Sequence, residues 1–137
     1  MDIKQAIEAI NVFAVFAAAL SSFLIGGLWY SVLFANVWSR ENGLSDEELR
    51  NRKMGMIFGT SFLLSVIISF VLAMFLGPDR NGMMGLSAGF MAGLFWVAAA
   101  MGITYLFEKK SLSLFFINAG YHVITFTVMG FILGVWK

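Results

Sequence analysis

Four long apolar stretches alternate with short polar segments along this chain, and none of the four contains Asp, Glu, Lys or Arg. A helix crosses the ~30 Å hydrocarbon layer of a bilayer with about 20 residues, because each residue rises ~1.5 Å. The pattern therefore predicts one all-α domain over residues 1–137, an integral membrane bundle of four transmembrane helices. The expected spans are residues 10–34, 54–76, 83–107 and 112–136.

The polar segments indicate how the spans connect. Residues 77–82 contain the only proline and form a turn sequence, which makes spans two and three antiparallel neighbours. The loop over residues 35–53 contains a capping box at residues 45–48, which predicts a short helix before span two. Three basic residues follow it: Arg50, Arg52 and Lys53. We expect a solvated connector with cationic anchors, or else a docking site for a cytoplasmic partner.

Composition excludes several functions. Only 12% of residues are charged, against roughly 25% in soluble domains, and 60% are hydrophobic. The formal charge of +1 provides no basic surface for a nucleic acid, so no nucleic-acid partner is expected. With no cysteine and a single histidine, the chain offers no disulfide, no thiolate and no histidine cluster, so we expect neither a metal nor a cofactor.

The distribution of Lys and Arg predicts the orientation in the membrane, because cytoplasmic loops carry an excess of these residues. The face with both termini and the second loop holds Lys4, Arg80 and Lys137. The opposite face holds Arg40, Arg50, Arg52, Lys53, Lys109 and Lys110. We therefore expect a multi-pass protein with both termini outside and the loop 35–53 in the cytoplasm.

Small residues recur at intervals of four on the spans, and such stripes let membrane helices approach closely. We expect helix packing at Gly26, Gly85, Gly89, Gly93, Gly130 and Gly134. The stripes predict a compact bundle surrounded by the lipid bilayer. They also leave open a homo-oligomer or a membrane-protein partner, with the glycines of span three facing another subunit.

A weak internal similarity suggests two parallel-repeat helical hairpins. Residues 27–30 end span one with a Gly-x-x-Tyr pattern, as residues 102–105 end span three, which pairs Tyr30 with Tyr105. Such repeats are related by an axis along the membrane normal in several transporters.

Polar residues concentrate on span four, where Asn118 and His122 share one helix face. A polar side chain in hydrocarbon is costly unless it has a partner, so both should point into the bundle. The candidate polar pocket, counted by depth along the spans, consists of Asn118, His122, Tyr121, Tyr30, Trp29, Ser22 and Ser65. These residues form either interhelical hydrogen bonds that fix the packing or a pocket for a small molecule, and His122 should bond to span one or two.

A possible nucleophile motif, G-x-S-x-G, occurs at residues 85–89. Counting ~1.5 Å per residue places Ser87 about 15 Å in depth from His122, too far for a nucleophile and its base. We therefore name no catalytic residue and expect no enzyme.

The chain resembles a family of small bacterial four-span membrane proteins, domain-of-unknown-function family 1761. The resemblance rests on residues 26–34 with the Trp-Tyr pair, on Trp38, on residues 118–122, and on two Gly-containing pairs, 129–130 and 133–134. It implies the four-span architecture and the bacterial cytoplasmic membrane, and it carries no catalytic residues.

Two functions remain. The chain is expected to be a structural or accessory membrane protein that binds a membrane partner or a lipid. The alternative is a small transporter or channel subunit with a polar pocket in the cytoplasmic half of the bundle.

Overall fold

The computed structural model describes residues 2–137, and this part of the chain contains helices and no strand. The fold class, an all-α membrane bundle, is confirmed. Four helical stretches are long and apolar enough to cross a bilayer: Val12–Leu33, Met54–Leu76, Gly82–Phe107 and Leu112–Val135. Their elements are α1 (Ile3–Glu8), α2 (Val12–Gly27), η1 (Leu28–Leu33), α3 (Ala35–Glu41), α4 (Asp46–Arg50), α5 (Met54–Leu76), α6 (Gly82–Met91), η2 (Ala92–Ala98), α7 (Ala99–Phe107) and α8 (Leu112–Val135).

The spans begin and end within about two residues of the limits expected from hydropathy, because polar caps stop the helices where the apolar stretches stop. The side chain of Asn11 accepts hydrogen bonds from the first backbone N–H groups of α2, Asn81 does the same for α6, and Ser111 for α8. Gly77 ends α5 with a φ of 71°, a conformation that favours glycine.

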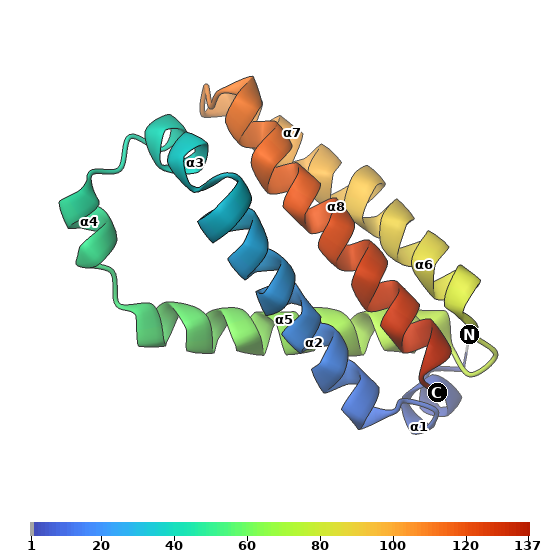
Figure 1. The fold of residues 1–137 in the computed structure, drawn as a ribbon. Helices are drawn as coiled ribbons and strands as arrows, with labels where there is room; N and C mark the ends of the chain where they lie inside the picture. The colour runs from blue at the N-terminus through green and yellow to red at the C-terminus, as the bar shows by residue number, and fades with distance from the viewer. Residues whose placement is uncertain (1) are drawn as a thin grey trace.

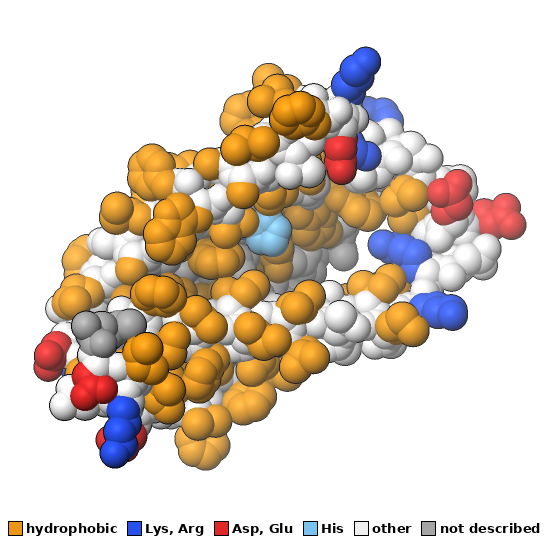
Figure 2. All heavy atoms as spheres, turned by 180° about the vertical axis from the view of Figure 1, so that it is seen from behind, with side chains coloured by type: hydrophobic (Ala, Val, Ile, Leu, Met, Phe, Trp, Pro, Cys, Tyr) orange, Lys and Arg blue, Asp and Glu red, His pale blue; other side chains and the backbone are white. Residues whose placement is uncertain are grey.

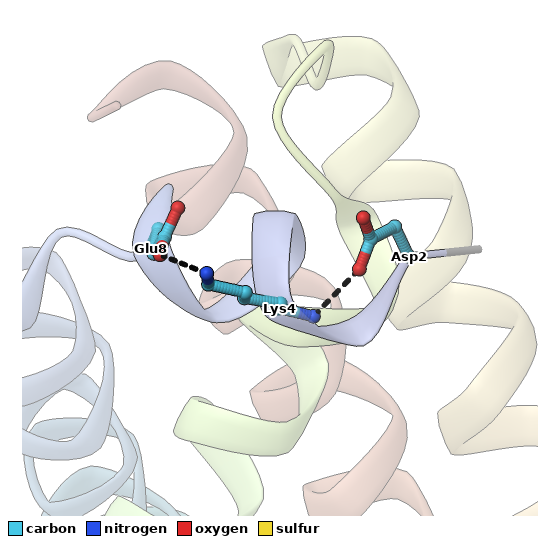
Figure 3. Close-up of polar contacts among 3 residues, drawn as sticks. All are labelled: Asp2, Lys4 and Glu8. Carbon is cyan, nitrogen blue, oxygen red and sulfur yellow. Dashed lines mark hydrogen bonds and ion pairs between the residues drawn. The ribbon is translucent and has the colours of Figure 1, made fainter.

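The short helix α1 precedes the first span and was not expected from the apolar pattern. The carboxylate of Asp2 accepts a hydrogen bond from the backbone N–H of Lys4, and the Lys4 ammonium lies 4.0 Å from the carboxylate of Glu8 (Figure 3). The helix packs near α5 and buries Ala6, so it covers the end of the bundle where both termini lie.

Two of the four spans run side by side and the other two cross (Figure 1). The span α6–η2–α7 follows α8 along its length, α2 packs against α8 from another side, and α5 crosses beneath α2. We call the end with both termini the terminal end, and the end with α3 and α4 the loop end. Because α2 and α5 cross whereas α6–η2–α7 follows α8, the hairpin α2/α5 is more open than the hairpin α6–α7/α8. The parallel duplication stays a prediction.

Glycine determines the close contact between α6 and α8. A Cβ on Gly85 would overlap the carbonyl oxygen of Gly130, and one on Gly89 would overlap that of Phe126. On η2, a Cβ at Gly93 would lie 2.9 Å from the Cα of Val123. The glycines of span three therefore face span four of the same chain, as expected of packing residues, and any contact between subunits would need another surface.

The best packed part of the bundle lies toward the terminal end. The core cluster consists of Ala14, Val15, Ala18, Leu72, Ala73, Met129 and Leu133. The hydroxyl of Ser69, completely buried, donates a hydrogen bond of 2.9 Å to the carbonyl of Val15 and so joins α5 to α2. Every buried residue of α5 lies in its C-terminal third, and the N-terminal part of the helix has far fewer contacts.

Arg80 lies in the turn after α5, and only 1% of its surface is exposed. Its guanidinium donates to the carbonyls of Leu133 at 2.8 Å, Gly77 at 2.8 Å and Ala9 at 3.1 Å. All three carbonyls stand at helix C-termini, where backbone oxygens lack intrahelical partners and the helix dipole favours a cation. Burial lowers the pKa of Arg80 from its ordinary value. One side chain therefore caps α1, α5 and α8 together.

The loop 35–53 contains the short helix that the capping box predicted. Ser45 accepts a hydrogen bond of 3.1 Å from the backbone N–H of Glu48, and α4 follows as expected. Among the described residues, neither of the helix pairs spaced four apart, Asp46 with Arg50 and Glu48 with Arg52, forms an ion pair. The acidic and basic side chains of α4 are therefore not joined to each other by close ion pairs.

Candidate functional site

A cleft of about 720 Å³ opens toward the loop end, within the range of small-molecule sites. One wall is α2 with η1 and α3, the other is the N-terminal half of α5, and α8 with α7 forms the floor. Figure 2 shows the surface hollowed between two arms of the molecule, with the pale-blue imidazole visible inside the hollow. The cleft exists because α5 separates from α2 beyond their crossing point (Figure 1).

The segment η1 positions two aromatic residues against α8. Its π-helical hydrogen bonding widens the helix locally, a feature that is frequent at functional sites. The indole N–H of Trp29 donates a hydrogen bond of 2.8 Å to the carbonyl of Ile117. The hydroxyl of the next residue, Tyr30, donates one of 2.7 Å to Oδ1 of Asn118. Two consecutive side chains therefore attach the end of span one to span four.

Asn118 lies at the centre of a hydrogen-bonded triad. Its Oδ1 accepts from Tyr30, and its Nδ2 donates to the hydroxyl of Tyr105 on α7 at 2.7 Å. Both ends of the amide are satisfied, so the triad joins spans one, three and four within the apolar interior. The two tyrosines that the proposed repeat pairs with each other thus contact the same residue.

A second polar chain crosses the deeper part of the cleft. The hydroxyl of Tyr121 donates to the carbonyl of Ser22 at 2.9 Å, and the Ser22 hydroxyl lies 3.1 Å from that of Ser65 on α5. Gly26 makes room for this arrangement, since a Cβ there would lie 3.3 Å from the Tyr121 hydroxyl. This chain of contacts joins α8, α2 and α5 where the cleft ends.

His122 lines the cleft without a hydrogen bond to any other described residue. Its ring packs against Tyr121, with centroids 5.1 Å apart. The expectation that span one or two would supply a partner is wrong, because the Ser22 hydroxyl of α2 contacts the Ala19 carbonyl and the Ser65 hydroxyl of α5 instead. The imidazole therefore presents unused hydrogen-bonding capacity to the cleft.

Of the seven residues proposed for the polar pocket, six line the cleft: Asn118, His122, Tyr121, Tyr30, Ser22 and Ser65. Trp29 does not line it. Its ring lies against Gly120, where a Cβ would come within 3.1 Å of the indole. Trp29 therefore packs against α8 and does not line the cleft. Its place in the sequence beside Tyr30 gave no indication of this difference.

The mouth of the cleft contains two residues that were not among the candidates, Trp38 and Arg52. The Arg52 guanidinium carbon lies 6.0 Å from the centroid of the Trp38 ring, a cation–π distance. Its Nε also donates to the carbonyl of Leu49 at 3.1 Å. The sequence indicated Trp38 only as part of the family resemblance and Arg52 only as a cationic anchor, but the path of α3 and α4 brings the two together.

The G-x-S-x-G pattern has a structural explanation. Gly85 and Gly89 face the backbone of α8, whereas Ser87 is exposed on α6 and His122 lines the cleft. The spacing of this motif is that of a helix contact, and its serine does not belong to the cleft.

A family described as "Protein of unknown function (DUF1761)" matches residues 13–134, which extend from the first turn of α2 to the last turn of α8. The chain belongs to this family. The match includes every residue of the cleft named above, so the cleft lies within the part of the chain that defines membership. Searches of curated proteins and of solved structures found no match. This family member is an integral, multi-pass membrane protein of unknown activity.

Proposed function

We propose that this protein is a structural or accessory membrane protein, not an enzyme, and that it binds a membrane lipid in the cleft. The observation that carries the proposal is the distribution of polar and apolar groups over the lining of the cleft. Most of the deep polar groups are satisfied by one another, and the wall formed by α5 presents Met54, Ile57 and Phe58. A molecule that enters the cleft therefore meets mainly apolar surface.

The depth of the cleft also supports a lipid. Residues of α5 line it from Met54 to Ser65, about 16 Å at ~1.5 Å per residue. That length is about half of the ~30 Å hydrocarbon layer, the depth of a single leaflet. An acyl chain of one leaflet would fit between α2 and α5 without crossing the bilayer midplane.

Two matched glycines test the proposal. Gly27 lines the cleft and Gly59 does not, although both have open space where a Cβ would stand. Gly27→Leu should obstruct the cleft, whereas Gly59→Leu adds the same side chain on the outer surface of α5. We expect native mass spectrometry of the detergent-extracted protein to show bound lipid for the unmodified chain and Gly59→Leu, and much less for Gly27→Leu. Equal lipid retention by all three proteins would refute lipid binding in the cleft.

A second candidate function is a small transporter or channel subunit. The unpartnered imidazole of His122 favours it, because a hydrogen-bonding group that faces a cleft in a membrane can bind a polar solute. A saturable solute flux in proteoliposomes that His122→Gln abolishes would support transport. If the flux equals that of empty liposomes and lipid is bound, transport is refuted and only the accessory role remains.

A further inference from the structure

Arg52 is the one charged residue that lines the cleft in the described part of the chain. The lining contains no Asp or Glu among residues 2–137, so the positive charge at the mouth is not compensated within the cleft. An anion at the mouth would be attracted by the charge of Arg52, and no acidic side chain of the lining opposes it.

The Arg52 guanidinium is held in place yet keeps free donors. Its Nε bonds to Leu49 and its plane lies near Trp38, whereas its two terminal nitrogens have no hydrogen bond to a described residue. Glu48, four residues earlier, forms no ion pair with it. The planar fork of a guanidinium matches the oxygens of a phosphate, and restricting its motion lowers the entropic cost of binding.

The position of Arg52 just before a membrane span suits contact with a lipid headgroup. It precedes the first residue of α5 by two positions, and Lys53 beside it is also exposed. From this level the cleft continues along α5 to Ser65, the leaflet-length path already described. A phosphate at the mouth and an acyl chain in the cleft would therefore be held by one continuous site.

We propose that the cleft selects an anionic phospholipid, whose phosphate binds Arg52 beside Trp38 and whose acyl chain lies along α5. This inference rests on the proposed lipid binding and adds the class of headgroup. Zwitterionic lipids would enter the same cleft with lower affinity, because their positive group lies near the guanidinium.

The experiment measures binding of phosphatidylglycerol and of phosphatidylcholine with identical acyl chains to the purified full-length protein, by native mass spectrometry in a mild detergent. Arg52→Gln is compared with Arg50→Gln, which removes an exposed arginine of α4 outside the cleft lining. We expect the unmodified protein and Arg50→Gln to prefer phosphatidylglycerol by about tenfold, the effect of one charge-assisted contact. Arg52→Gln should lose this preference while its affinity for phosphatidylcholine stays unchanged.

The outcomes separate the two proposals. Equal binding of both lipids by the unmodified protein, or the same loss in Arg50→Gln as in Arg52→Gln, overturns the headgroup assignment and leaves lipid binding intact. Absence of binding for both lipids overturns both proposals. Competition by inorganic phosphate as strong as that by phosphatidylglycerol overturns the lipid source, since the acyl chain would then contribute nothing. Unchanged unfolding midpoints confirm that the variants are folded.

Discussion

Replacing Arg80 tests whether one buried guanidinium holds the terminal end of the bundle together. In the structure it donates to the carbonyls of Leu133, Gly77 and Ala9. Arg80→Lys keeps the charge but concentrates its donors on one nitrogen, which cannot reach carbonyls arranged around a fork. Arg80→Met keeps the length of the side chain and removes every donor.

The magnitude follows from the hydrogen bonds. A hydrogen bond that involves a charged group contributes about 1.5–3 kcal/mol net. If Arg80→Lys loses two of the three, the free energy of unfolding should fall by about 3–6 kcal/mol. Arg80→Met removes all three hydrogen bonds to helix-terminal carbonyls, and by the same reckoning we expect a loss of about 4.5–9 kcal/mol.

The assay is reversible unfolding by sodium dodecyl sulfate in mixed micelles, followed by far-ultraviolet circular dichroism. Arg50→Lys is the matched control, because Arg50 is exposed on α4 and its replacement should change stability by less than about 0.5 kcal/mol. If Arg80→Met unfolds at the same detergent fraction as the unmodified protein, the cost of burying the cation equals what its hydrogen bonds contribute. The assignment of Arg80 as a stabilising cap would then be refuted.

Three further predictions concern packing, orientation and the triad. Gly85→Ala should lower stability by about 1–3 kcal/mol because its methyl group overlaps the backbone of α8, whereas Gly59→Ala, with open space around it, should not; equal midpoints would contradict the close contact. With no native cysteine, Asp79→Cys should react with an impermeant thiol reagent in intact cells and Glu47→Cys only after permeabilisation; the reverse result would invert the orientation. Asn118→Leu should destabilise the protein by about 1–2 kcal/mol by removing its contacts with two tyrosines, measured by the same detergent titration, and no change would show that the triad does not stabilise the bundle.

The spans and much of the polar cluster could be predicted because both depend on local rules. Hydropathy alone limits the four helices, and caps such as Asn81 and Ser111 stand next to the helices that they begin. Asn118 and His122 share a face through the helical repeat, and the cost of a polar group in lipid directs that face inward.

The remainder depends on contacts that sequence spacing does not encode. Arg80 looked like one charge in an exposed turn, since its three carbonyl partners come from helix ends up to 71 residues away. The contact at the mouth of the cleft could not be predicted for the same reason: Arg52 and Trp38 are 14 positions apart and meet only through the path of the loop that contains α3 and α4. His122 has no hydrogen-bond partner among residues 2–137 and faces the cleft that opens between α2 and α5, and hydropathy contains no information on the angle between two helices.

Because of the angle between α2 and α5, the helix α5 is anchored near its C-terminus and extends away from α2 toward its N-terminus. Its C-terminal part is fixed by Ser69 and by the capped turn at Gly77, while its other end is joined to the rest of the protein through α4. Met54 lies about 22 Å from Ser69 along the helix at ~1.5 Å per residue, so a rotation of roughly 10° at this fulcrum moves the free end by about 4 Å. The width of the opening therefore depends on the angle that α5 makes at Ser69, so a substitution there should alter the opening without touching the mouth.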